Sequence, residues 1–257
     1  MKETYVKETV QIELRSPVLV EGLPGMGMVG RIAVRFLIKQ LGAVRFAELY
    51  SPHFPYYVLV NKRGSVRLLR CEFFYWKNPG GDNDLVFLVG DSQAQTIEGQ
   101  YDVTNAILEF AVKVGVGRIF TIGGYRQEAE GAPRVVAVST KPELLAKALE
   151  AEAVASPAGN PIVGTAGLLL GLAKFRRVDA LCLLGETRGY LPDPVSAKGV
   201  LEVLEKLLGL KLDYSGLDVQ IEKSKEIASR MREIEERREK FSQKMKRSEE
   251  GRVTYIS

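Results

Sequence analysis

The stretch that decides the expected fold is residues 22–30, which read Gly22-Leu23-Pro24-Gly25-Met26-Gly27-Met28-Val29-Gly30. An apolar run at residues 18–20 precedes it and predicts a strand, and residues 31–40 follow with the apolar content of a mostly buried helix. In this context the Gly-x-Gly-x-x-Gly pattern at positions 25–30 can hold a dinucleotide phosphate. The alternative is a tight turn in which glycine only permits close packing of strand and helix. Both interpretations predict a strand–turn–helix unit of an α/β protein.

Other residues bear on the choice between these two interpretations. A dinucleotide site needs an acidic residue about 20 positions beyond the fingerprint to hold a ribose, and Glu48 has that spacing. Pro24, Met26 and Met28 are not what this fingerprint usually shows, and no Gly-Lys-Ser/Thr follows to make a Walker loop. The sequence therefore favours glycines that shape one edge of the protein.

The rest of the chain repeats the order strand, polar loop, helix up to about residue 212. Continuous apolar runs predict buried parallel strands at residues 85–90, 118–123 and 179–184. Helices are expected at residues 101–114, 142–150, 164–173 and 195–208. Shorter strands are expected at residues 9–14, 44–49, 56–60, 65–69, 71–76 and 133–138. This alternation predicts that residues 1–212 form a three-layer α/β/α core domain with a largely parallel sheet.

Composition limits the classes of function. The chain has 257 residues, 46% of them hydrophobic and 26% charged, with a net charge of +4, so nucleic acid is only a distant third alternative as a partner. No apolar run has the length of a membrane helix and no signal peptide is present, so we expect a cytoplasmic protein without a membrane partner. His53 is the only histidine, and Cys71 and Cys182 are the only cysteines, so we expect no metal and no cofactor.

Four loops should meet at one edge of the sheet, because the carboxyl ends of parallel strands lie there. They offer carboxylates, arginines and glycine amides to a phosphate or a small polar ligand. The candidate crevice residues are Gly22, Gly25, Gly27, Gly30, Asp91, Gly123, Gly124, Arg126, Glu186 and Arg188. The alternative is structural: Glu186 would accept hydrogen bonds from loop amides, and Asp193 would cap the helix after Pro194.

The composition changes towards the C-terminus. Residues 217–250 are dense in Lys, Arg and Glu and contain no proline or glycine, which predicts a charged helical arm or a helical hairpin. A narrow apolar seam follows this segment at Ile227, Met231, Ile234, Phe241 and Met245. The seam suits a partner helix or the body of the protein, and the alternative is a solvated helix. Residues 251–257 are expected to form a flexible tail.

Three motifs in order along the chain resemble the proteasome assembly chaperone family in its archaeal branch. They are Gly22-Leu23-Pro24-Gly25-Met26-Gly27-Met28-Val29-Gly30, Gly123-Gly124-Tyr125, and Gly185-Glu186-Thr187-Arg188-Gly189-Tyr190 with Asp193-Pro194. The resemblance covers residues 16–212. It implies a three-layer α/β fold similar to nucleoside phosphorylases, no established catalytic reaction, homo-oligomers, and a role in assembling the proteasome α-ring.

The resemblance also implies a role for the C-terminal residues in binding a partner. Family members that act on the α-ring end with a hydrophobic residue, a tyrosine and one further residue. Such a tail can enter a pocket between α-subunits, bury its ring and pair its carboxylate with a lysine. The candidate partner-binding residues here are Val253, Tyr255, Ile256 and Ser257, which lie one register away from that motif. The alternative is a disordered end.

The expected function is therefore a non-enzymatic, homo-oligomeric chaperone or adaptor that contacts proteasome α-subunits or a related ring through its tail. The alternative of a different class is an enzyme or sensor that binds a nucleoside or nucleotide in the glycine-lined crevice. In that alternative Arg126 or Arg188 would hold a phosphate, and Glu186 would serve as acid, base or ribose ligand.

Overall fold

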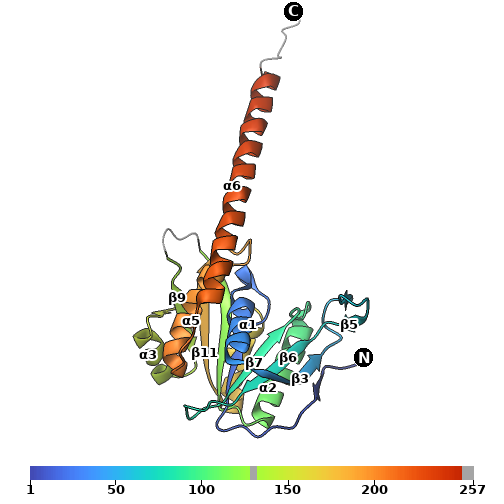
Figure 1. Ribbon diagram of the computed structural model, residues 1–257, viewed down its shortest axis with the longest axis vertical. Coiled ribbons are helices and arrows are strands. Elements are labelled where there is room, and N and C mark those ends of the chain that lie inside the picture. Colours follow the sequence, from blue (N-terminus) through green and yellow to red (C-terminus); the bar gives the residue numbers. More distant parts are fainter. Residues whose placement is uncertain (128–131, 251–257) are drawn as a thin grey trace, which may run out of the picture. The chain divides into compact units, whose positions relative to one another are not determined.

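The computed structural model describes residues 1–127 and 132–250. The chain divides into two compact units, Met1–Tyr214 and a C-terminal unit that begins at Ser215. The first unit is an α/β body, and the described residues of the second form the helix α6 (Ser215–Glu250) (Figure 1).

A nine-stranded sheet forms the middle layer of the body, in the order β1-β3-β6-β7-β2-β8-β11-β9-β10. The strands are β1 (Tyr5–Glu8), β2 (Val18–Glu21), β3 (Val44–Tyr50), β6 (Cys71–Trp76), β7 (Leu85–Gly90), β8 (Arg118–Arg126), β9 (Val135–Ser139), β10 (Val154–Ala155) and β11 (Asp179–Thr187). The central strands β7, β2, β8 and β11 run parallel, whereas β6, β3 and β1 on one side and β9 on the other add antiparallel pairs. The sheet is therefore mixed, with a parallel centre.

Helices cover both faces of this sheet and complete the three layers. On one face α1 (Val29–Leu41) contacts α5 (Pro194–Leu208), and α3 (Pro142–Glu150) packs beside α5 against β9 (Figure 1). On the other face α2 (Ile97–Lys113) contacts α4 (Thr165–Ala173). All residues of β2 and β7 are buried, because a central strand covered on both faces exposes neither set of its side chains. The predicted three-layer α/β/α fold is confirmed, and the likeness to nucleoside phosphorylases stays a prediction.

The core between the sheet and α2 contains three aromatic rings that all contact one another. Phe73 meets the other two edge-on, with ring centroids 4.7 Å from Phe110 and 6.3 Å from Phe46, whereas Phe46 and Phe110 are stacked with centroids 5.7 Å apart. The two cysteines are also buried in this core. Burial raises the pKa of Cys182 to about 12 and raises that of Cys71 further, so both remain neutral thiols at physiological pH.

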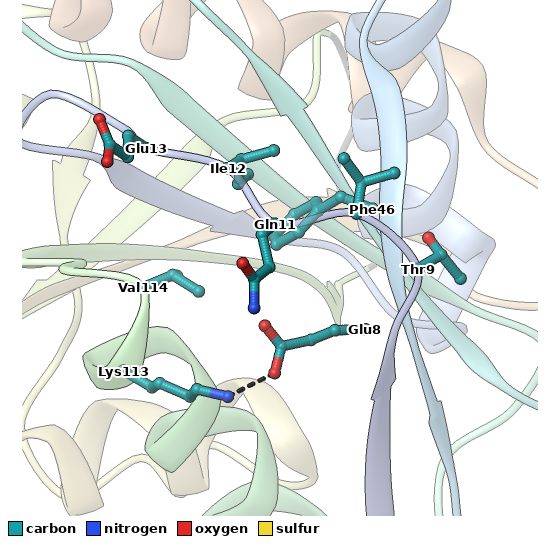
Figure 2. A pocket seen from close by; sticks show the side chains of 9 residues that line it. Glu8, Thr9, Gln11, Ile12, Glu13, Phe46, Lys113 and Val114 are labelled. Carbon is teal, nitrogen blue, oxygen red and sulfur yellow. Dashed lines mark hydrogen bonds and ion pairs between the residues drawn. The ribbon is translucent and has the colours of Figure 1, made fainter.

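The N-terminal edge strand differs from the prediction. The strand expected at residues 9–14 is wrong, because β1 pairs with β3 only from Tyr5 to Glu8. The carbonyl of Phe46 accepts from the amides of both Thr9 (2.8 Å) and Val10 (3.3 Å), next to a register shift in β3, so the ladder ends there. Residues 9–13, which follow β1, line one side of a cavity of about 730 Å³ (Figure 2). Lys113 pairs with Glu8 in this cavity.

A separate two-stranded sheet stands apart from the main one. The antiparallel strands β4 (Val58–Val60) and β5 (Val66–Leu68) are joined by a turn in which the Asn61 side chain accepts from the amides of Arg63 and Ser65. Leu59 points to the core, and the other four aliphatic side chains point away from it. We call these four the hairpin face: Val58, Val60, Val66 and Leu68, which are 46–68% exposed.

The C-terminal unit is one uninterrupted helix along its described length, so the hairpin alternative for this segment does not apply. Three members of the predicted seam, Ile227, Met231 and Ile234, are exposed. The side chains of Phe241 and Met245 lie outside the described part of the chain. The predicted tail residues Val253, Tyr255, Ile256 and Ser257 also lie outside the described residues.

Candidate functional site

The glycines of residues 22–30 allow three elements to approach one another closely. A Cβ on Gly22 would lie 2.2 Å from the carbonyl oxygen of Gly30, and one on Gly30 would lie 2.3 Å from the carbonyl oxygen of Ile122. Both contacts are far shorter than side-chain carbons tolerate. Glycine is therefore required here for β2, α1 and β8 to pack, and this accounts for Gly22 and Gly30 without any cofactor.

The dinucleotide interpretation also fails at its acidic residue. The strand that follows α1 is β3, which is separated from β2 by β6 and β7 in the sheet. Glu48 on β3 pairs with Arg70 (2.8 Å) and Arg45 (3.0 Å) and accepts from the Tyr50 hydroxyl (2.8 Å). A ribose at the glycine stretch is out of its reach, because two strands lie between them.

The glycine stretch is joined to the loop after β11. After the short 3₁₀ turn η1 (Met26–Met28), where Gly27 has a φ of +59°, α1 begins. The carbonyl of Gly27 accepts from the Asp193 amide at 2.8 Å. The Asp193 carboxylate accepts from the Ser196 amide at 2.9 Å and from the Thr187 hydroxyl at 2.8 Å. The predicted helix cap at Asp193 is confirmed, and the backbone amide of the same residue joins its loop to the glycine stretch.

Glu186 on β11 is a buried carboxylate that pairs with Arg134, whose side chain is 58% exposed. Its carboxylate accepts from the backbone amide of Arg134 at 2.9 Å, from the Arg134 guanidinium at 2.8 Å, and from the Tyr125 hydroxyl. Burial opposes ionisation of this carboxyl, but the hydrogen bonds from Tyr125 and Arg134 outweigh it and lower its pKa. The structural alternative for Glu186 is therefore observed, with Arg134 as the donor.

A cavity of about 530 Å³ does open at this edge of the sheet. We call it the crevice, and its walls come from the ends of β2 and β8, residues 23–30, and residues 161–166 before and within α4. The predicted residues that line it are Gly25, Gly30, Gly123, Gly124 and Arg126. The residues Gly123, Gly124 and Glu186 belong to strands rather than loops, because β8 and β11 stay paired as far as Arg126 and Thr187.

The other predicted residues do not line the crevice: Gly22, Gly27, Asp91, Glu186 and Arg188. Asp91 instead forms a bidentate pair with Arg67 of β5 and accepts from the Arg70 amide at 3.1 Å. Burial works against its ionisation, but the bonds from Arg67 and Arg70 lower its pKa overall. Arg188 is exposed on the loop after β11. Arg126 lies over the Tyr190 ring, 4.7 Å from its centroid, and also bonds to the Tyr190 hydroxyl.

Sequence reasoning missed four polar residues of the crevice, Glu21, Gln93, Gln100 and Tyr125. The Gln93 side chain donates to the Pro24 carbonyl at 2.8 Å and accepts from the Thr165 amide at 3.0 Å, so it bridges the glycine stretch and α4. Glu21 ends β2 and is only 1% exposed. Its position supplied a signal, because a charged residue directly after the apolar run at residues 18–20 is unusual for a buried strand.

The Glu21 carboxyl is incompletely bonded. Oε1 accepts from the Leu23 amide at 2.9 Å, whereas Oε2 has no hydrogen-bond partner among the described residues. Burial raises the pKa of Glu21 to about 7, and the Leu23 bond offsets only part of that rise.

Residues 1–127 and 132–250 contain no group of three or more His, Cys, Asp or Glu side chains placed to bind a metal ion. Within those same ranges, no helix combines the length and apolar character needed to cross a membrane.

The body is thus a three-layer α/β domain whose glycine-rich loops close around a crevice at the carboxyl end of its parallel strands. Residues 19–235 match the model of the PAC2 family, and the chain belongs to that family. The predicted resemblance to the proteasome assembly chaperone family in archaea is confirmed, because the structures of an archaeal proteasome activator and of an archaeal homolog of proteasome-assembly chaperone are similar to this one.

The most informative relatives come from archaea. The crystal structure of Pyrococcus furiosus PbaB, an archaeal proteasome activator, is 38% identical, covers 90% of this chain and 100% of that one, and has a TM-score of 0.86. Pyrococcus furiosus PbaA, an archaeal homolog of proteasome-assembly chaperone, is 26% identical over 97% of this chain and 100% of that one, with a TM-score of 0.72. An uncharacterized protein of Methanocaldococcus jannaschii is 32% identical over 100% of this chain and 98% of its own length.

Proposed function

We propose that this protein is a non-enzymatic, homo-oligomeric chaperone or adaptor that acts on the proteasome α-ring or a related ring. The likeness to PbaB carries this proposal, because that relative is a proteasome activator and is 38% identical to this chain in an alignment that covers 90% of it. Membership of the PAC2 family over residues 19–235 supports the same class of function.

The hairpin face supports the homo-oligomer. Four aliphatic side chains lie exposed on one side of a two-stranded sheet, and Tyr56 beside them is fully exposed. A two-stranded sheet gains little stability in water by itself, and an exposed apolar cluster of this kind is typical of a protein interface. We infer that a second copy of the chain covers the hairpin face.

Light scattering after size-exclusion chromatography tests the oligomer. The double variant Val60→Asp, Val66→Asp places two like charges opposite each other on the hairpin face and should reduce the particle mass towards that of one chain. Lys62→Asp, in the exposed turn, is the matched control and should keep the wild-type mass. An unchanged mass for the double variant would remove the hairpin face from the interface.

The C-terminal tail is the proposed contact with the ring. Val253, Tyr255, Ile256 and Ser257 provide aliphatic, aromatic and carboxylate groups that can add to a pocket edge and bury a ring there. The helix α6 precedes them, so the tail is presented at the end of a helix of 36 residues.

Capture of purified archaeal α-rings by the immobilised full-length chain tests the ring contact. A chain that ends at Gly251 and the variant Tyr255→Ala should both capture less, whereas Thr254→Ala should capture as much as the wild type. Equal capture by the full-length and shortened chains would refute the role of the tail. Failure of every form to capture a ring would refute the ring as the partner.

The geometry does not favour a catalytic version of the nucleoside or nucleotide alternative. Glu186, its intended acid, base or ribose ligand, is bound by Tyr125 and Arg134 and does not line the crevice. Arg188, one of the two intended phosphate ligands, does not line it either.

A further inference from the structure

An apolar stripe runs along α6 and is open to solvent. Ile227, Met231 and Ile234 follow one another at intervals of four and three residues, and they are 54%, 45% and 55% exposed. Charged side chains occupy most of the other exposed positions of the described helix. Because a helix in a protein gains most of its stability from packing its apolar face, an open stripe on a helix of 36 residues indicates a partner.

The spacing of the stripe is that of a coiled coil. Apolar residues at alternating intervals of four and three occupy the d and a positions of the seven-residue repeat that coiled coils share. Ile227 and Ile234 are d residues, and Met231 is the a residue between them. The sequence continues the repeat with Phe241 at d and Met245 at a. The repeat therefore extends along about 27 Å of helix.

Arg238 favours another helix as the partner over an apolar protein surface. It occupies the a position between Ile234 and Phe241, and its side chain is exposed. Burial of its guanidinium against an apolar surface would cost free energy, because nothing would compensate the charge. A coiled coil tolerates a cation at a single a position, since the long stem of the side chain carries the charge to solvent at the edge of the seam.

The charges beside the stripe indicate which helix it binds and in which direction. The g positions of the repeat hold Lys223, Arg230 and Arg237, which are all basic and all exposed. An antiparallel pair of α6 helices would place g residues against g residues, so these like charges would repel one another. In a parallel pair a g residue meets the e residue five positions further along the partner helix, and Glu235 follows Arg230 at that spacing. The helix is therefore complementary to a second copy of itself in the parallel direction.

We propose that α6 of one copy of the chain pairs with α6 of a second copy as a parallel coiled coil through Ile227, Met231 and Ile234. This pairing rests on the proposed homo-oligomer and adds to it an interface that is separate from the hairpin face. Association of the bodies raises the effective concentration of one α6 near another, so a short coiled coil can form. The C-terminal ends of the two helices then lie together, and two copies of the sequence 251–257 begin at one place.

Disulfide cross-linking of the full-length chain tests the pairing. Met231→Cys places a thiol in the seam, whereas Ser229→Cys is the matched control at an exposed f position on the opposite side of the helix. Under mild oxidation Met231→Cys should form covalent dimers at least about tenfold faster than Ser229→Cys, because the seam holds two thiols at a high effective concentration. The native Cys71 and Cys182 are buried and do not contribute while the protein is folded.

A second pair of variants tests the direction. In a parallel coiled coil each seam residue faces its own counterpart, so Ile227→Cys should cross-link to itself and not to co-expressed Met245→Cys that carries a tag of different mass. Mixed dimers in preference to Ile227→Cys dimers would overturn the parallel direction.

Light scattering on the wild type separates this proposal from the one on which it rests. An oligomeric wild type combined with equal cross-linking rates for Met231→Cys and Ser229→Cys would overturn the coiled coil and leave the homo-oligomer in place. A wild type with the mass of one chain would overturn both.

Discussion

The free energy of unfolding of the wild type should fall as the pH rises, because Glu21 loses a proton. The variant Glu21→Gln should not show this fall. The folded state raises the pKa of Glu21 from 4.5 to about 7, because burial disfavours the charged form. The folded protein therefore holds a proton between these values that the unfolded chain releases. The contribution of this proton is fully present below pH 4.5 and is lost as the pH rises through 7.

The size of this effect follows from the two pKa values. One pKa unit corresponds to about 1.4 kcal/mol, so the change from 4.5 to about 7 corresponds to roughly 3 kcal/mol. The nearby thiols Cys71 and Cys182 add nothing over this range, because burial raises both of their pKa values to about 12 or above. Glutamine has nearly the same shape as a protonated glutamate and does not titrate.

Urea unfolding followed by circular dichroism between pH 4.5 and pH 8 measures this difference. The free energy of unfolding of the wild type should fall by roughly 3 kcal/mol relative to Glu21→Gln across that range. Glu13→Gln, at an exposed position, is the control and should run parallel to the wild type. A constant difference between wild type and Glu21→Gln at every pH would refute the argument that Glu21 is buried and incompletely bonded.

Three further variants test how the glycine stretch and its neighbouring loops are held. Gly30→Ala should lower the free energy of unfolding in urea by about 3 kcal/mol, because its Cβ would meet the Ile122 carbonyl at 2.3 Å, whereas Gly80→Ala, with open space around it, should cost little. Asp193→Ala should lower that free energy by about 1–2 kcal/mol through loss of the α5 cap, and Asp193→Asn should restore part of it. Glu186→Gln should destabilise the protein at neutral pH, and this difference should vanish in acid, because the lowered pKa of Glu186 confines its contribution to higher pH.

The central strands of the sheet were predictable because each of them is a continuous run of apolar residues in the sequence. β2 and β7 are covered on both faces, so every one of their side chains is buried and the pattern is continuous. The N-terminal strand was misplaced because residues 9–14 alternate as a strand does, although Phe46 accepts from two successive amides and ends the ladder earlier. Hydrogen bonding to a strand that is distant in the sequence produces no pattern in residues 9–14 themselves, so the end of the strand could not be predicted.

The candidate site was predictable in its location but not in its chemistry. Gly25, Gly123 and Gly124 line the crevice as expected, because the carboxyl ends of parallel strands meet there. Asp91 and Glu186 do not, since each is paired with an arginine that comes from elsewhere in the sequence, Arg67 or Arg134. Such pairings depend on tertiary contacts, and a single sequence does not contain them.

Because α6 is uninterrupted, the number of its residues determines the distance between its two ends. At 1.5 Å per residue, a helix of 36 residues spans about 54 Å from Ser215 to Glu250. Deleting seven residues from the exposed part of α6 would shorten the helix by about 10 Å and leave the sequence of residues 251–257 unchanged. The length of this helix and the sequence that follows it are therefore two properties of the C-terminal end that can be varied separately.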